Sequence, residues 1–233
     1  MYYEAVKTFD PNTKGKDYVV GDLHGCYTLL MQKLESIGFD KDKDRLFSVG
    51  DLIDRGSENE KCLTLLNELW FHTVRGNHEQ LLVDAVNQGE IDLHFINGGI
   101  WFYTLQEEER WEIADNLDSL PFAIELYTKD RKKIVIVHAD CGSGDEQSWA
   151  FTRKQLNKGC EYTRAQVLWS RERIKTFRNP PRHPIPILDI NLAVVGHSMV
   201  DSPIMIDNVM YIDTGAVFTG NLTLFDVDEW RTV

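Results

Sequence analysis

Three short polar motifs, each placed directly after an apolar run, constrain this fold more than any other feature of the sequence. They read Gly-Asp-Leu-His-Gly, Gly-Asp-Leu-Ile-Asp-Arg-Gly and Arg-Gly-Asn-His-Glu, at Gly21–Gly25, Gly50–Gly56 and Arg75–Glu79. Apolar runs of this length are typical of buried strands, so we expect strands at 18–20, 46–49 and 71–74. Stretches with helical spacing lie between them. The repeated order of strand, motif and helix predicts a βαβαβ unit in an α/β fold with a parallel sheet.

The three motifs should meet at one edge of the sheet. The carboxyl ends of parallel strands lie there, and open α/β sheets bind ligands at that edge. A single Gly-Asp-x-His-Gly is weak evidence, because Asp and Gly also favour turns. Three such loops are stronger evidence: Asp51 follows Asp22 by 29 residues, and Asn77 follows Asp51 by 26. We therefore expect a metal or a phosphate at this edge.

The composition is that of a soluble globular protein, and we assign residues 1–233 to one domain. The net charge of −12 argues against nucleic acid or anionic membranes as partners, because both require clustered positive charge. No apolar run reaches the ~18 residues of a membrane helix, and no secretory signal is visible. We therefore expect a cytoplasmic protein. The four cysteines lack Cys-x-x-Cys spacing and are expected to be free thiols.

After residue 120 the pattern changes to short strands that should close a second sheet. We expect an antiparallel hairpin from 122–127 and 133–137, followed by strands at 192–195, 204–206, 209–212 and 222–225. Helical patterns occur at 90–120 and 162–175, and a proline-rich loop is expected at 179–186. Residues 1–17 predict an edge strand or a loose tail.

Two of the later strands end in histidine, His138 after 133–137 and His197 after 192–195. With the motif residues they complete a set of good ligands for divalent first-row metals, namely Asp22, His24, Asp51, Asn77, His138 and His197. Six ligands are more than one ion takes while leaving room for water and substrate. The set therefore predicts two ions that share a carboxylate and clamp a phosphoryl group for in-line attack.

Arginines in the same loops suit the binding of phosphate oxygens through their forked guanidinium groups. The candidates are Arg55, Arg75 and Arg171, although Arg173 is as plausible as Arg171 from the sequence alone.

His78 lies next to Asn77 but is not needed as a ligand. It is therefore a candidate general acid for the leaving oxygen, with Asp54 orienting it and favouring its protonated form. Asp140 and Asp213 are either acceptors for ligand histidines or turn formers. Histidines without such a setting are expected to be structural or at the surface, and these are His72, His94 and His183.

The three motifs, in this order and spacing, resemble the signature of the phosphoprotein phosphatase family of metallophosphoesterases, most closely its phage and bacterial members. The similarity runs nearly end to end and continues at Asn97–Gly99, His138–Asp140, Trp169, Arg171–Arg173, Gly196–His197 and Tyr211–Leu224. The resemblance implies a β-sandwich of two mixed sheets flanked by helices. It also implies two divalent ions, typically manganese, with iron, zinc, nickel or cobalt as alternatives.

When the family's ligand positions are carried over motif by motif, the resemblance assigns one ion to Asp22, His24 and Asp51. The second ion would share Asp51 and add Asn77, His138 and His197. The resemblance also favours Arg171 over Arg173 as a phosphate ligand.

The predicted site residues and the family resemblance together predict a metal-dependent serine/threonine protein phosphatase. It would hydrolyse phosphomonoesters in phosphorylated proteins or peptides, with small phosphoesters as a further class, by direct attack of a metal-bridging hydroxide. One alternative is a dinucleoside tetraphosphate hydrolase, which would share every motif. A second is a non-enzymatic, metal-stabilised regulatory protein; such proteins usually lose ligands, whereas here all six and His78 are present.

Overall fold

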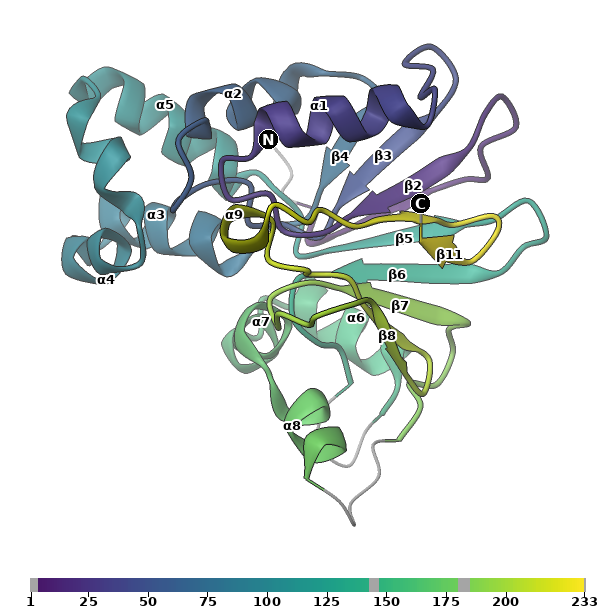
Figure 1. Cartoon of the computed structure of the whole chain (residues 1–233). Helices are drawn as coiled ribbons and strands as arrows, with labels where there is room; N and C mark the ends of the chain where they lie inside the picture. The colour runs from purple at the N-terminus through teal and green to yellow at the C-terminus, as the bar shows by residue number, and fades with distance from the viewer. Residues whose placement is uncertain (1–3, 143–146, 180–184, 233) are drawn as a thin grey trace.

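The chain folds into two β-sheets packed face to face, with helices on the outer face of each sheet (Figure 1). The computed structural model describes residues 4–142, 147–179 and 185–232. Most of the predicted proline-rich loop therefore lies outside the described residues, and so does His183. The expected architecture of two mixed sheets flanked by helices is confirmed.

The five-stranded sheet contains the predicted βαβαβ unit. Its order is β11-β10-β2-β3-β4, with β2 (Asp17–Val20), β3 (Arg45–Ser48), β4 (Phe71–Thr73), β10 (Leu224–Asp226) and β11 (Arg231–Thr232). β2, β3 and β4 are parallel, and β10 is antiparallel to β2. The crossovers are α1 (Tyr27–Ser36) and α2 (Asn59–Thr64), the latter continued by the 3-10 turn η1 (Leu65–Asn67).

The six-stranded sheet has the order β1-β5-β6-β7-β9-β8. Its strands are β1 (Val6–Phe9), β5 (Ala123–Tyr127), β6 (Lys133–Val137), β7 (Leu192–Val195), β8 (Ile204–Ile206) and β9 (Val209–Tyr211). β5 and β6 form the predicted antiparallel hairpin. β6 and β7 are parallel, so the residues that follow them emerge at the same edge.

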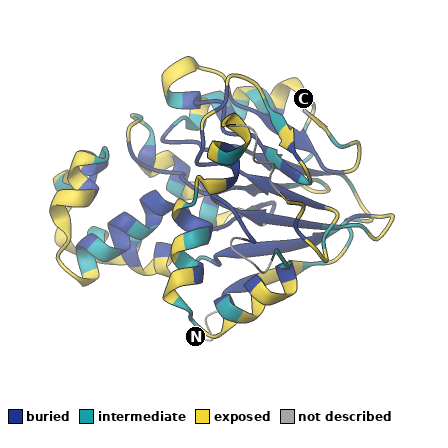
Figure 2. Cartoon of the chain, turned by 90° about the horizontal axis from the view of Figure 1, so that it is seen from below, coloured by how far each residue is buried: buried dark blue, intermediate teal, exposed yellow. Residues whose placement is uncertain are grey.

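Alternation along the strands produces three apolar layers. Ile134 and Ile136 of β6 pack between the sheets with Phe47 of β3, whereas Val135 and Val137 face the helices outside. Because side chains of a strand alternate between its faces, a strand buried on both sides must be apolar throughout. Figure 2 shows the strands largely buried, with exposed residues gathered on helices and loops.

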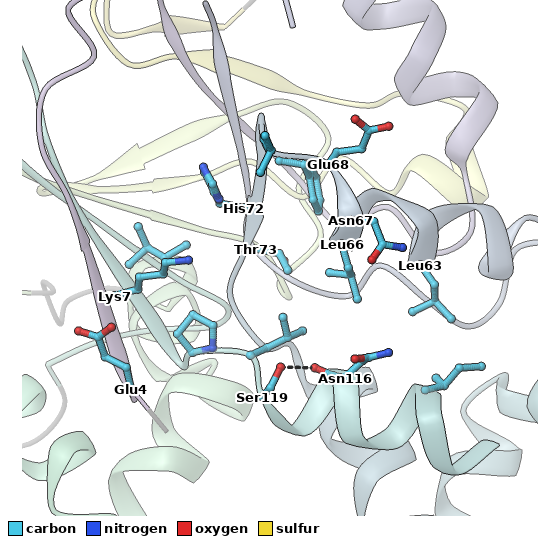
Figure 3. Close-up of a pocket in the computed structure, with 16 residues that line it drawn as sticks. Glu4, Lys7, Leu63, Leu66, Asn67, Glu68, His72, Thr73, Asn116 and Ser119 are labelled. Atoms are coloured by element: carbon cyan, nitrogen blue, oxygen red, sulfur yellow. Dashed lines mark hydrogen bonds between the residues drawn. The ribbon is translucent and has the colours of Figure 1, made fainter. Parts of the chain in front are cut away.

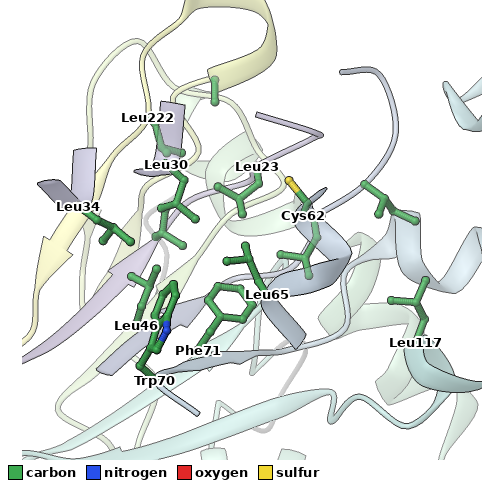
Figure 4. Close-up of a cluster of buried hydrophobic side chains, with 14 of the residues drawn as sticks. Leu23, Leu30, Leu34, Leu46, Cys62, Leu65, Trp70, Phe71, Leu117 and Leu222 are labelled. Atoms are coloured by element: carbon green, nitrogen blue, oxygen red, sulfur yellow. The ribbon is translucent and has the colours of Figure 1, made fainter. Parts of the chain in front are cut away.

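The helices divide between the two outer faces. The five-stranded sheet is covered by α1, α2, α3 (Asn77–Asn87) and α5 (Glu107–Asp118). Leu30 and Leu34 of α1 and Leu65 of η1 belong to one apolar cluster with Phe71 and Trp70 (Figure 4). The six-stranded sheet is covered by α6 (Trp149–Asn157), α7 (Glu161–Trp169) and α8 (Glu172–Arg178). The remaining helical elements are α4 (Ile91–Ile96), η2 (Gly99–Thr104) and α9 (Ala216–Thr219).

Three expectations differ from the structure. The strand expected at 222–225 does not close the second sheet, because β10 pairs with β2 in the first, where Leu224 and Phe225 face opposite apolar layers. The helix expected at 162–175 is two helices, because Ser170 is extended with ψ 132°. Helix α6 was not anticipated. Of the two readings of residues 1–17, the edge strand is correct, since β1 pairs with β5.

A surface pocket of about 510 Å³ lies between the edge strands β1 and β4 and helix α5 (Figure 3). Lys7, His72 and Asn116 line it, and none of its lining residues is a predicted site residue. Within the described part of the chain, no helix has the length and apolarity needed to cross a membrane.

Candidate metal and phosphate site

The loops after β2, β3, β4, β6 and β7 bring the predicted ligands together at one end of the two sheets. Several of these loop residues have a positive φ, which L-residues rarely adopt outside functional loops. They are His24 (42°), Asp51 (53°), Asp54 (72°), Arg55 (70°) and His197 (62°). Five of the nine non-glycine residues with positive φ in the described part of the chain are thus predicted site residues.

Asp51 lies at the centre of the cluster. Its Oδ2 is 3.4 Å from His138 Nε2, 3.5 Å from His24 Nε2 and 4.0 Å from His78 Nε2. Its Oδ1 accepts a hydrogen bond of 3.0 Å from the His78 backbone N–H. Gly76 permits this approach, since a Cβ there would fall 2.2 Å from Asp51 Oδ1.

A second group of atoms converges on Asn77, the first residue of α3. Its Oδ1 lies 2.7 Å from His138 Nε2 and 2.8 Å from His197 Nδ1. The other ring nitrogens point outward, His138 Nδ1 to the Val49 carbonyl at 2.8 Å and His197 Nε2 to the Trp169 carbonyl at 3.2 Å. A carbonyl requires a proton on the nitrogen it faces. For His138 the inner Nε2 therefore presents a lone pair to Asn77 Oδ1. His197 Nε2 also accepts a hydrogen bond of 3.2 Å from Arg171 Nε, so its contacts do not assign the proton to one nitrogen.

His24 follows the same rule, since its Nδ1 lies 2.8 Å from the Ile53 carbonyl and leaves Nε2 facing Asp51. Burial lowers the pKa of His24 to about 4 and that of His197 to about 3, so both rings are neutral ligands at neutral pH.

Asp22 completes the ligand set from the end of β2. Its two oxygens accept the His197 backbone N–H at 3.2 and 3.1 Å, and a Cβ on Gly196 would fall 1.9 Å from Oδ1. Burial and the neighbouring carboxylates of Asp213 and Asp51 raise its pKa well above the ordinary value. Buried acids in such proximity are stabilised by a cation.

These residues fit divalent ions on the chemistry of the donors alone. The amide oxygen of Asn77 and the lone pair of His138 Nε2 face each other at 2.7 Å, an arrangement that repels itself unless a cation lies between them. Two triads, Asp22–Asp51–His138 and His24–Asp51–His78, each offer ligand atoms within 4.8 Å of one another. Asp51 belongs to both, as the predicted bridging role requires. The second triad contains His78, where the prediction had Asp22.

His78 is paired with Asp54 as predicted, through a bond of 2.7 Å between Nδ1 and Oδ2. Burial alone would lower the pKa of His78, but the Asp51 and Asp54 carboxylates beside it hold that pKa above its ordinary value. Its Nε2 is buried and has no hydrogen-bond partner among the described residues. This atom is available to a leaving oxygen.

The arginines divide into two kinds. Arg55 is exposed and its Nη1 lies 2.6 Å from His24 Nε2, while Arg171 is exposed and its Nε lies 3.2 Å from His197 Nε2. Arg75 is buried, and its guanidinium contacts Gln80 and Asp118. These contacts do not favour the predicted phosphate role of Arg75, which stays a prediction.

Arg173 is also buried. It donates to Asp140 at 3.2 Å and to the Ile185 carbonyl at 2.7 Å. Of the two arginines, Arg171 lies beside a predicted ligand and Arg173 does not contact one in the described structure; the phosphate role of Arg171 stays a prediction. Asp140 accepts from Arg173 and the Cys141 N–H, and Asp213 accepts from the Gly215 N–H. Backbone carbonyls, not these aspartates, are the outer partners of the ligand histidines.

Two residues in contact with predicted site residues were not singled out from the sequence. Glu79 accepts backbone N–H groups of Asp51, Leu52 and Gly76, each at 2.8 Å; its place in the third motif was the available signal. His94, expected to be structural or at the surface, is fully buried and contacts Asp54 at 3.1 Å. No pattern in the sequence distinguished it from the other unassigned histidines.

Comparison with known proteins finds a match to the calcineurin-like phosphoesterase family over residues 18–201. The chain is 38% identical over 213 residues to serine/threonine-protein phosphatase 2 of Salmonella typhimurium, covering 90% of this chain and 92% of that protein. It is 44% identical over 142 residues to a symmetrical bis(5'-nucleosyl)-tetraphosphatase of Pasteurella multocida, covering 60% of this chain and 44% of that one.

A solved protein serine/threonine phosphatase structure from Saccharomyces cerevisiae has the same fold. The TM-score between the two structures is 0.65 at 15% sequence identity, and the match covers 95% of this chain and 76% of the yeast protein chain.

Proposed function

Because the chain belongs to the calcineurin-like phosphoesterase family, we propose that it is a metal-dependent serine/threonine protein phosphatase. The similarity to a bacterial serine/threonine-protein phosphatase extends over 90% of the chain. The observation that carries the proposal is the position of Asp51, whose Oδ2 lies within 4.0 Å of three imidazole Nε2 atoms. A carboxylate so placed suits a site for two ions.

Asp22, His24 and Asp51 would hold one ion, and Asp51, Asn77, His138 and His197 the other. Two divalent ions, which we propose to be manganese, would supply positive charge to the phosphoryl oxygens and to the attacking water. The protein supplies the geometry, because each ligand histidine is fixed by a carbonyl on its outer nitrogen.

Arg55 and Arg171 lie on the exposed side of the ligands, where they would bind the phosphate oxygens and orient the ester bond. His78 would give its Nε2 proton to the serine or threonine oxygen as the P–O bond breaks. Asp54 would hold the imidazolium in place through its bond to Nδ1.

The test is phosphate release by chelator-stripped protein, with and without added manganese. A phosphoserine peptide and a dinucleoside tetraphosphate are offered side by side. Manganese-dependent turnover of the peptide alone supports the proposal. Turnover of the nucleotide alone would support the metal site but would mean that the substrate is a different one. No turnover of either substrate, with two ions bound, would favour a non-enzymatic role.

The dinucleoside tetraphosphate hydrolase is the second candidate, because the chain is 44% identical to one such enzyme over 142 residues. The match leaves more than half of that relative uncovered, since it spans 44% of its length. The phosphatase relative is matched over 92% of its length, so the phosphatase is the better supported function.

A further inference from the structure

The short helix α4 packs against the rest of the protein through a histidine, His94, and not through its apolar residues. Of its six residues, Ile91–Ile96, only His94 is buried. The apolar residues Ile91, Leu93, Phe95 and Ile96 are exposed instead, the last at 76%. A helix normally buries its apolar side and exposes its polar side. Helix α4 does the reverse.

The partner of His94 is Asp54, which is itself fully buried. His94 Nε2 lies 3.1 Å from Asp54 Oδ1, and the indole N–H of Trp101 in η2 donates to the same oxygen at 2.8 Å. Asp54 Oδ2 is bonded to His78 Nδ1 at 2.7 Å. Both oxygens are thus engaged. A carboxylate otherwise rotates readily about its terminal torsion, and these bonds fix its plane.

The imidazole of His94 is itself held from two sides. The Tyr103 hydroxyl lies 3.0 Å from its Nδ1. When this hydroxyl donates to Nδ1, the ring proton lies on Nε2 and is directed at Asp54. On the other side is Gly99, where a Cβ would fall 2.2 Å from Nε2. The Asn97–Gly99 sequence therefore has a physical reason, because any side chain at 99 would displace the ring.

We propose that His94, together with Trp101, is a positioning residue for the phosphoryl transfer, which holds Asp54 and through it the proton donor His78. The inference rests on the proposed function, because the step concerned is protonation of the leaving group. In that step the P–O ester bond breaks, its electron pair stays on the leaving oxygen, and this oxygen takes the Nε2 proton of His78. A tilted His78 would leave that oxygen without its proton.

The leaving group distinguishes this role from a merely structural one. A serine alkoxide is a poor leaving group and needs the proton, whereas p-nitrophenolate departs without it. We expect His94→Leu, which removes the donor but keeps an apolar volume, to lower kcat on a phosphoserine peptide by about 10- to 100-fold. The loss on p-nitrophenyl phosphate should be less than about threefold. Equal losses on both substrates would overturn the proposal.

Two further variants keep the proposal testable if His94→Leu does not fold. His94→Gln places an amide N–H near the position of Nε2 and should recover most of the peptide activity. Trp101→Phe removes one donor from Asp54 while keeping an aromatic ring, and should lower peptide turnover about three- to tenfold with little effect on p-nitrophenyl phosphate. A His94→Gln variant as impaired as His94→Leu, or unchanged peptide turnover in Trp101→Phe, would contradict the role.

A double-mutant cycle with His78 supplies the second readout. In a His78→Asn background the proton donor is already absent, so adding His94→Leu should change kcat on the peptide by less than about twofold. A full additional loss would mean that His94 acts on something other than His78. If the wild type hydrolyses p-nitrophenyl phosphate but not the peptide, the proposed substrate fails, and the His94 comparison is made on a small alkyl phosphate instead.

Discussion

Glu79 Oε2 accepts a 2.8 Å hydrogen bond from the backbone N–H of Asp51, although the two residues belong to different motifs. The same carboxylate takes the N–H groups of Leu52 and Gly76. Two loops are therefore joined by one buried side chain. Glu79 thus holds the backbone of Asp51, the central residue of the predicted metal site.

Replacing Glu79 by Gln should destabilise the fold by about 2–3 kcal/mol, because an amide cannot accept three N–H groups and turns a donor toward one of them. Urea unfolding measures the change. Glu35→Gln, on the exposed surface of α1, is the matched control and should stay within about 0.5 kcal/mol of the wild type. Equal midpoints for the two variants would mean that the Glu79 contacts carry no net stability.

Asp51→Asn should remove bound metal and activity together, since the shared ligand loses its charge. We expect at least a ~100-fold fall in kcat/KM, with fewer than two ions per chain by elemental analysis after dialysis. Asp42→Asn, an exposed change elsewhere, should keep both. Retention of two ions by Asp51→Asn would refute the bridging role.

Arg171 and Arg173 form a matched pair with opposite expectations. Arg171→Ala should raise KM for a phosphoserine peptide, and the inhibition constant of inorganic phosphate, by about tenfold without changing Tm. Arg173→Ala should leave the buried Asp140 without its cationic partner, and should reduce the free energy of unfolding by about 3–5 kcal/mol. If thermal melting moves for Arg171 and not for Arg173, the assignments are reversed.

His72 gives the fold a measurable pH dependence. Burial, with the charges of Lys7 and Arg45, lowers its pKa to about 4, against about 6.5 in an unfolded chain. The unfolded chain therefore takes up the proton first. Above pH ~7 His72 has no effect on stability; the penalty grows as pH falls from ~6.5 toward ~4 and is complete below that.

The expected penalty is about 2 kcal/mol, reduced from the full shift because the ring is partly exposed. His72→Phe keeps the ring contacts with Phe9 and Phe47 and removes the titration. The difference in unfolding free energy between wild type and variant should therefore change between pH 7 and pH 4. A constant difference across this range would show that His72 does not titrate as described.

The convergence of the predicted ligands could be anticipated from the sequence because each of them follows an apolar run that is a strand. Strand ends are visible in a sequence, and parallel pairing brings them to one edge. For His138 and His197, which lie far from the motifs along the chain, the strand ends gave candidates, and the family resemblance supported including them in the set. The position of Asp22 and the pairing of His78 with Asp54 required no further information.

What the sequence did not predict depends on the direction of side chains between distant segments. His94 and Asp54 are 40 residues apart, and nothing in an amphipathic pattern indicates that a helix will bury its histidine and expose its isoleucines. Arg75 belongs to a motif, yet its direction is decided by Asp118 at the end of α5. The sequence likewise does not show which sheet β10 will join, because that depends on which strand has an edge free to pair with it. In the structure that strand is β2.

The contact between Asp22 and the His197 backbone joins residues separated by 175 positions. During synthesis the first motif leaves the ribosome long before its partner exists, and the loops that surround Asp22 must wait for almost the whole chain. Until then the acidic and imidazole groups are dispersed along an incomplete chain. If the predicted ligands hold the metals, a nascent chain that ends before His197 would lack part of the metal site, and hydrolysis would begin only after that residue has been translated.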